Sequence, residues 1–173
     1  MKTLIIIGHS NSNSFSHSIS NSYREGALEK GEVKTIDLAT LKFDPILRLG
    51  FQGQQELEPD LVEAQRLIKW ADHIAFVFPI WWSLYPAILK GFIDRVFLPD
   101  FSFKYVENKA LPIALLKGRT AEIIATSDAP SFFRKYILGD PTIKALKRDT
   151  LKFCGVKVTK VTRIGSVRVS NEH

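Results

Sequence analysis

Short apolar runs alternate along the chain with longer segments whose apolar residues recur every three or four positions. Residues 2–7 and 73–78 are mostly apolar, as in strands that are buried on both faces of a sheet. Residues 33–37, 119–126 and 156–164 are further runs rich in β-branched residues. The pattern therefore predicts five strands.

The segments after the first two strands carry start signals of helices. Ser14 or a near neighbour can cap a helix that runs to about Lys30 and stops at Gly31. Pro59 suits the first position of a second helix, and Asp60 favours the positive end of its dipole. The apolar face of that second helix is formed by residues 57, 61, 64, 68 and 71.

Two more helices are expected after the third and fourth strands. Residues 86–97 have a broad apolar side, and residues 141–154 lie between an N-cap at Asp140 and a stop at Gly155. This alternation of strands and helices predicts an α/β protein with a parallel sheet that is covered on both faces.

Two features fall outside the alternation. The stretch 41–58 has no clear period, and we expect it to cross the surface as an irregular segment. Lys157, Lys160 and Arg163 in the last strand suit a sheet edge that is protected by charge.

The composition indicates one globular domain over residues 1–173, because 45% of 173 residues are hydrophobic. The single cysteine, Cys154, excludes an internal disulfide and a multi-cysteine metal site, so we expect no metal and a reducing, cytoplasmic setting. No signal peptide or bilayer-length apolar run is recognised, so no membrane insertion is expected. The net charge of +6 is scattered, so nucleic-acid binding is not expected.

An open parallel sheet binds its ligands at the carboxyl ends of its strands. The loop after the first strand, 8–16, is rich in serine and asparagine and leads into a helix N-terminus, where free backbone N–H groups attract anions. It lacks the dinucleotide fingerprint and the P-loop motif. It is therefore interpreted as a phosphate-binding loop, with a well-capped polar loop as the alternative.

The loop after the third strand, 79–86, contains Trp81, Trp82 and Tyr85. These aromatic residues could belong to the core or to a dimer contact, or they could form an apolar platform for an isoalloxazine ring. The loop after the fourth strand, 126–130, carries hydroxyl groups that could close over the edge of such a ring, although its residues are common in turns.

These segments resemble the flavodoxin-like family of NAD(P)H–quinone oxidoreductases, which includes the ancillary flavoprotein subunits of glutathione-gated potassium efflux systems. The resemblance spans nearly the whole chain and is most specific over 78–97. The matching segments are Gly8-His9 with Ser14-Phe15-Ser16, Phe43-Asp44-Pro45, Phe78-Pro79-Ile80-Trp81-Trp82, 86–97, Phe101-Ser102-Phe103 and Leu116-Lys117-Gly118-Arg119.

The resemblance implies a doubly wound five-stranded sheet of order 2-1-3-4-5 and a homodimer with one flavin per subunit at the dimer interface. Helix 86–97 would pack near the partner subunit, with its aromatic side chains exposed toward that subunit. The flavin phosphate and ribityl chain would be held by His9, Asn13, Ser14, Phe15 and Ser16. The ring would be flanked by Pro79, Ile80, Trp81, Trp82 and Ser83, with Thr126, Ser127 and Asp128 along its other edge.

The expected activity is two-electron transfer from NAD(P)H to a quinone or similar acceptor. FMN is expected rather than FAD, because members that bind FAD often carry more chain after the last strand. Many members also have a Thr-Thr-Gly-Gly turn and a tyrosine–histidine pair at the substrate site. This chain has Thr126-Ser127-Asp128-Ala129 and no histidine between His73 and His173, so no catalytic side chain is assigned.

Two other functions remain open from the sequence. The protein could be a flavin-binding regulatory subunit of a potassium efflux transporter, which the altered substrate loop favours. It could also be a one-electron carrier such as flavodoxin, although such carriers tend to be acidic and this chain is basic.

Overall fold

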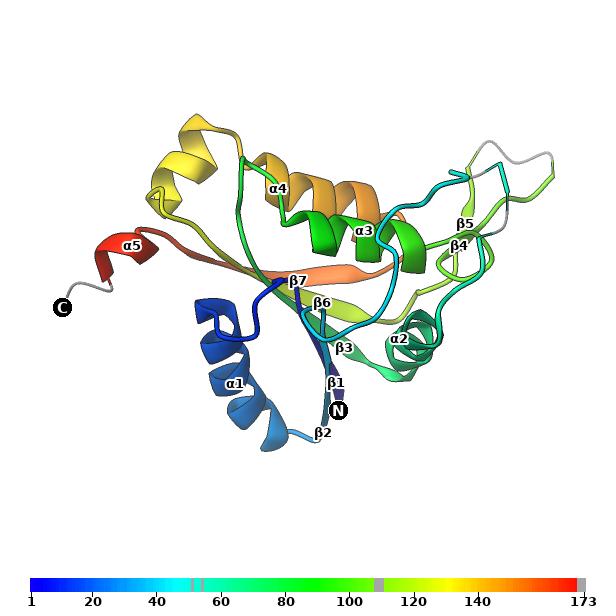
Figure 1. The fold of residues 1–173 in the computed structure, drawn as a ribbon, viewed down its shortest axis with the longest axis horizontal. Coiled ribbons are helices and arrows are strands. Elements are labelled where there is room, and N and C mark those ends of the chain that lie inside the picture. The colour runs from blue at the N-terminus through cyan, green and yellow to red at the C-terminus, as the bar shows by residue number, and fades with distance from the viewer. Residues whose placement is uncertain (51, 54, 108–110, 171–173) are drawn as a thin grey trace.

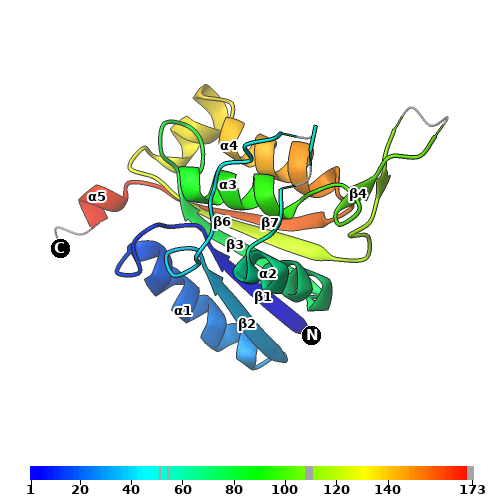
Figure 2. The same cartoon turned by 45° about the vertical axis from the view of Figure 1, so that its right-hand side comes forward.

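The computed structural model describes residues 1–50, 52–53, 55–107 and 111–170. A five-stranded parallel sheet runs through the centre of the molecule, in the order β2-β1-β3-β6-β7 (Figures 1 and 2). This confirms the expected doubly wound, flavodoxin-like order. The strands are β1 (Lys2–Ile7), β2 (Glu32–Asp37), β3 (His73–Pro79), β6 (Thr120–Thr126) and β7 (Lys157–Ile164).

Helices cover both faces of the sheet, as the apolar patterns predict. In Figure 1, α1 lies on one face and α2, α3 and the chain from α4 lie on the other. The helices are α1 (Phe15–Leu28), α2 (Pro59–Trp70), α3 (Ala87–Val96), α4 (Pro141–Lys144) and the wider helical turns η2 (Ala145–Lys152).

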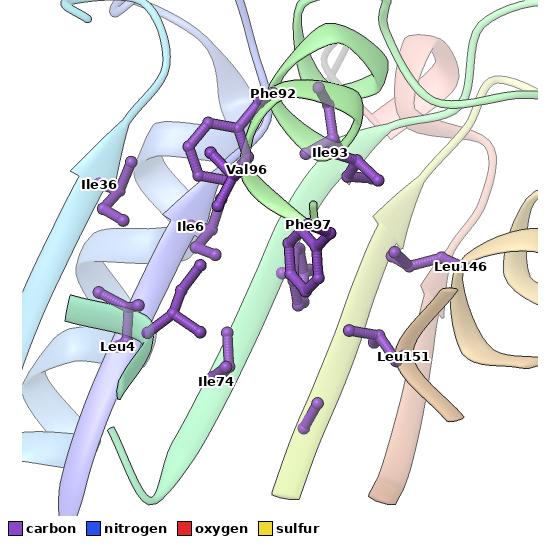
Figure 3. Packing of buried hydrophobic residues seen from close by; sticks show 14 of the residues in the cluster. Leu4, Ile6, Ile36, Ile74, Phe92, Ile93, Val96, Phe97, Leu146 and Leu151 are labelled. Atoms are coloured by element: carbon purple, nitrogen blue, oxygen red, sulfur yellow. The ribbon is translucent and has the colours of Figure 1, made fainter. Parts of the chain in front are cut away.

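Alternate side chains of the strands point to opposite faces of the sheet and belong to two separate hydrophobic cores. Leu4 and Ile6 of β1 face the larger core beneath α2, α3 and η2, which Figure 3 shows from close by. Ile5 and Ile7 face the smaller core, against Ile19 of α1. Because both faces of β1 are buried, a continuous apolar run is the pattern that this strand needs.

The predicted helix over 141–154 is found, but its start differs from the expected cap. Asp140 has a left-handed backbone (φ 57°), and its side chain makes no capping hydrogen bond. Its carboxylate instead accepts hydrogen bonds from Arg163 Nε, at 2.9 Å, and from Nη2. Asp140 therefore binds an arginine on a distant strand instead of capping the backbone of its own helix.

Helix α3 also differs from expectation. Its aromatic side chains were expected to be exposed toward a partner subunit, but Phe92 and Phe97 are buried in the core of this chain. That prediction was wrong because the apolar side of this helix faces its own sheet.

Four short elements have no counterpart among the predicted ones. The strands β4 (Phe103–Lys104) and β5 (Ile113–Ala114) pair as a small antiparallel ribbon. The wide turn η1 (Phe133–Ile137) and the short helix α5 (Val167–Ser170) flank the carboxyl ends of β6 and β7. Among the described residues, no helix is long and apolar enough to cross a membrane.

The irregular segment 41–58 is fixed to α3 by a buried arginine. The Arg95 side chain is fully buried, and its Nη2 lies 2.8 Å from Glu58 Oε2 and donates to the Glu56 carbonyl at 2.7 Å. Its Nη1 donates to the Asp44 carbonyl at 2.5 Å. Both ends of the segment are therefore held by one guanidinium group.

Replacing Arg95 by methionine tests this arrangement. We expect Arg95→Met to lower the free energy of unfolding by about 3 kcal/mol, because it leaves the partly buried Glu58 carboxylate without its cationic partner and two carbonyls without their donor. Urea denaturation measures the change. Arg66→Met is the control, because the Arg66–Glu63 pair lies on the exposed side of α2 and should be nearly neutral. Equal losses in both variants would contradict the prediction.

Candidate functional site at the carboxyl ends of the strands

The three loops singled out in the sequence meet at one edge of the sheet. Parallel pairing aligns Ile7 with Val77, and Pro79 with Thr126, so β1, β3 and β6 end side by side. The loops after them enclose a pocket of about 150 Å³. It is lined by His9, Phe15, Ser16, Pro79, Ile80, Trp81, Thr126, Ser127, Asp128 and Val167.

Nine of the thirteen predicted site residues line this pocket. Asn13 and Ser14 lie in the first loop but do not line it, and neither do Trp82 and Ser83 of the second loop. Val167 was not predicted. It reaches the pocket because its N–H donates to the Ser127 carbonyl at 3.2 Å, a contact without any local sequence signal.

The first loop is held by hydrogen bonds among its own residues. Asn11 N–H donates to His9 Nδ1, and Asn13 N–H donates to Asn11 Oδ1, each at 2.9 Å. Ser14 occupies the N-cap position of α1 but makes no side-chain capping bond. Within the described residues, the backbone N–H groups of Phe15 and Ser16 have no acceptor, so the helix N-terminus can accept an anion.

His9 is held as a neutral ring. Its ring packs edge-on against Trp81, with centroids 5.3 Å apart. Burial, followed by the nearby His17 ring, lowers the pKa of His9 below 6.5. Because Nδ1 accepts from Asn11 N–H, the neutral ring carries its hydrogen on Nε2, where it can serve as a donor.

The second loop is a tight turn with two residues in the left-handed region. Trp81 and Leu84 exchange both backbone hydrogen bonds, at 2.8 and 2.9 Å. Between them, Trp82 has φ 48° and Ser83 has φ 60°. A tryptophan in this conformation is unusual, and such strain is often kept for a function. The Trp82 side chain is fully exposed.

The third loop links the pocket to the neighbouring strands. Ile80 N–H donates to the Thr126 carbonyl at 2.7 Å, and Ser127 N–H donates to the Ile164 carbonyl at 2.8 Å. Ser127 Oγ donates to the Ala129 carbonyl at 2.8 Å, which closes the turn. These hydrogen bonds fix the loop to the ends of β3 and β7, where it forms one wall of the pocket.

The burial and contacts of four residues outside the three loops indicate their surroundings. Cys154 is buried, and burial raises its thiol pKa, as expected for a packed cysteine. His73 is structural, with its Nδ1 at 2.8 Å from Thr120 Oγ1. The His17 side chain is 14% exposed, and its Nε2 lies 2.9 Å from Asp37 Oδ2. Tyr136 is exposed and lies outside the pocket.

The pocket at the strand ends is smaller than a groove of about 770 Å³ between η2 and β7. That groove has an apolar floor and a basic rim, and none of the predicted site residues lines it. By volume alone this groove would be chosen as the ligand site. The polar loops and the helix N-terminus, however, all lie at the smaller pocket.

The residues at the strand ends fit a flavin mononucleotide. The open N–H groups at the start of α1 suit a phosphate, and the side chains of Pro79, Ile80 and Trp81 offer an apolar wall for a flat ring. The pocket lies where these two features meet, which is the arrangement that a phosphate and a ring joined by a short chain require.

A family model described as having a flavodoxin-like fold matches residues 1–173. This chain belongs to the flavodoxin-like family. Its similarity to NAD(P)H dehydrogenase (quinone) 1 of Cavia porcellus is 30% identity over 188 residues, which cover 91% of this chain and 66% of that relative.

Solved structures share the fold of this family member. The Smu.1420 protein of Streptococcus mutans UA159 is 36% identical, with a TM-score of 0.82, over 98% of this chain and 89% of that one. An FMN-dependent NADH-azoreductase from Bacillus anthracis, solved in complex with FMN, is 22% identical with a TM-score of 0.73, over 97% and 88% of the two chains. At that identity the likeness shows the fold alone.

The environment of His9 gives a pH prediction. Because the folded-state pKa of His9 is below 6.5, the unfolded chain binds a proton first as the pH falls. The stability that this residue contributes above pH 6.5 is therefore lost as the pH falls toward its folded pKa. Ring NMR of the folded protein should give a midpoint below 6.5, and His9→Gln should reduce the loss of stability between pH 7 and 5. A midpoint at or above 6.5 would contradict this assignment.

Proposed function

We propose that this protein is a flavin-dependent oxidoreductase that takes two electrons from NAD(P)H and passes them to quinones or similar acceptors. The observation that supports this most is the convergence of three loops on one pocket, with a helix N-terminus on one side and Trp81 on the other. The similarity to a quinone dehydrogenase over 91% of the chain supports the reaction class. FMN is the proposed cofactor, with FAD as the alternative.

In this proposal the first loop holds the phosphate end of the cofactor. The backbone N–H groups of Phe15 and Ser16 donate to the phosphate, and the side chains of Asn13 and Ser14 add donors beside them. His9 Nε2–H adds one further neutral donor at the pocket wall.

The other two loops hold and shield the ring. Trp81 covers the ring from water, and Thr126 and Ser127 lie along its far edge. The backbone N–H groups of Trp82 and Ser83 have no acceptor within the described residues, so they can donate to the polar edge of the ring. When bound, FMN supplies the hydride chemistry, and the protein supplies position and hydrogen bonds.

We also propose a domain organisation and a cellular location for this protein. The family match over the whole chain supports one flavin-binding domain, 1–173. The single buried cysteine suits a reducing compartment, which supports a cytoplasmic location.

An absorbance titration tests the function. FMN added to the purified protein should bind, bleach when NADH or NADPH is supplied without air, and recover when menadione follows. Bound flavin that neither nicotinamide bleaches would contradict the enzyme and favour the carrier or regulatory function.

Trp81→Ala tests the placement of the ring. We expect it to weaken FMN binding by about tenfold or more, because the ring loses its aromatic wall. Tyr105→Ala, which removes an exposed aromatic side chain outside the pocket, should leave the dissociation constant unchanged. Fluorescence quenching of FMN measures both, and equal affinities in the two variants would place the ring elsewhere.

We further propose that two copies associate through an exposed apolar patch beside the pocket. The patch consists of Trp82, Leu84, Phe132, Tyr136, Ile137 and Leu138. Thr142 Oγ1 donates to the Ser83 carbonyl at 2.7 Å and ties the chain that follows Leu138 to the loop of Trp82. Large apolar side chains gathered beside a ligand pocket are typical of an interaction surface.

Light scattering tests this association. The wild-type protein should have twice the chain mass of 19.6 kDa. Ile137→Asp should yield the single-chain mass, because a charge in the patch would be buried without a partner. Leu111→Asp alters an equally exposed apolar residue outside the patch and should remain dimeric. A wild-type monomer at micromolar concentration would contradict the proposal.

A further inference from the structure

The groove between η2 and β7 has no part in the proposed flavin function. It encloses about 770 Å³, which is within the range of small-molecule binding sites. The helical turns that follow α4 run beside β7 in both views (Figures 1 and 2). None of the residues that line this groove also lines the pocket at the strand ends. The groove is therefore a separate feature of the fold.

The floor of the groove is apolar because β7 contains a bulge. In a regular strand, two residues that are three positions apart point to opposite faces of the sheet. Here the pairing with β6 passes from Val158 directly to Lys160, and Thr159 is left out of the ladder. Val158 and Val161 both pack against the larger core. The apolar floor consists of Ile143, Val156, Val158 and Val161.

The groove is closed at both ends. At one end the chain turns at Gly155, whose φ of 92° is left-handed, and then enters β7. At the other end Arg163 Nε donates to Asp140 Oδ2 at 2.9 Å and links β7 to the start of α4. The two ends are roughly 20 Å apart, because Lys157 and Arg163 are six positions apart on a strand. This length suits one small molecule better than a protein segment that would continue past the ends.

The rim of the groove holds the excess positive charge of the molecule. The stretch 134–163 contains nine lysines and arginines and two aspartates, in a chain whose net charge is +6. Seven of the residues that line the groove are lysines or arginines. Asp140 is the acidic residue among the lining residues that the structure describes, and it is paired with Arg163. Charges that are scattered along the sequence are therefore gathered in space by folding.

Several of these rim lysines are free to bind an anion. Within the described part of the chain, four of them have no acidic partner: Lys144, Lys147, Lys152 and Lys157. An apolar floor bordered by unpaired ammonium groups is complementary to an amphipathic anion, whose hydrocarbon chain would cover the floor. None of the described lining residues is aromatic, so the groove offers nucleic-acid bases no stacking surface.

The distribution of charge gives such an anion a direction. A carboxylate would be repelled at the end where Asp140 lies. At the other end Lys152 and Lys157 stand on either side of Gly155 in the sequence, and both line the groove. The carboxylate is therefore expected at the Gly155 end, with its hydrocarbon chain running along β7 toward Arg163.

We propose that this groove binds a long-chain carboxylate, of the chemical class of the fatty acids. The hydrocarbon chain lies on the valine floor, and the carboxylate lies near Lys152 and Lys157. This is a second binding site of the protein, and it does not depend on the flavin function proposed above.

Calorimetry with three probes tests the chemistry of the ligand. At low ionic strength and below its micelle concentration, dodecanoate should bind more tightly than octanoate by about tenfold or more, because its longer chain removes more apolar surface from water. Dodecyltrimethylammonium, which has the same chain and a positive head group, should not bind. Added salt should weaken the binding of dodecanoate.

Variants test the two parts of the site. Lys152→Gln combined with Lys157→Gln should weaken dodecanoate binding by about tenfold, because two cations near the carboxylate are lost. Lys42→Gln combined with Lys104→Gln is the matched control, since these two lysines are exposed and lie outside the groove. Its affinity should stay within about twofold of the wild type. Val158→Thr keeps the branched shape but adds a hydroxyl to the floor, and it should weaken binding by about threefold or more.

Methyl NMR locates the bound chain. Dodecanoate should shift the methyl signals of Val158 and Val161 and leave those of Ile5 and Ile7, in the smaller core, unchanged. Shifts confined to Ile5 and Ile7 would overturn the proposal, because the chain would then bind on the other face of the sheet.

Three further outcomes would also overturn this site. Equal binding of dodecanoate and dodecyltrimethylammonium, or equal affinities in the two double variants, would show that the rim charges play no part. Binding of an acidic peptide or an oligonucleotide without any binding of dodecanoate would assign the groove to a macromolecule. All these measurements are made without flavin, so this site and the flavin function can fail independently of each other.

Discussion

Parallel pairing of β1, β3 and β6 is the constraint on which the site depends. Parallel strands point the same way, so every loop that leaves a carboxyl end starts from the same edge of the sheet. The pairing requires a helical crossover between strands, and the crossover after β1 supplies the helix N-terminus that faces the pocket. The start of α1 and the aromatic loop are thus side by side at one pocket, although Ser16 and Trp81 are far apart in sequence.

The buried guanidinium group of Arg95 holds the segment 41–58 against α3. The described residues 41–50, 52–53 and 55–58 form no helix or strand, so their backbone groups need partners from elsewhere. One guanidinium group supplies several of these partners and pairs with Glu58. Burial opposes ionisation of Glu58, but hydrogen bonds from backbone N–H groups and from Arg95 outweigh it and lower the pKa of that carboxyl.

Sequence patterns were sufficient for the sheet and for most of the pocket. A strand buried on both faces leaves a continuous apolar run, and a loop at its carboxyl end can be located as soon as that run stops. The patterns did not indicate which way a broad apolar helix side would face, so Phe92 and Phe97 were wrongly expected to be exposed. They also missed contacts made across the fold, such as Asp140 with Arg163 and Val167 with Ser127. These partners lie on different strands or segments, and no local periodicity encodes them.

The edge strand β7 affects whether the sheet can pair with the sheet of another molecule. β7 forms one border of the sheet, and its pairing with β6 is interrupted at Thr159, whose Oγ1 donates to the Ala121 carbonyl. Lys157 and Lys160 stand on either side of this bulge. A second sheet approaching that border would meet an irregular backbone and like charges. The β7 border is thus a poor template for pairing with the edge strand of another molecule.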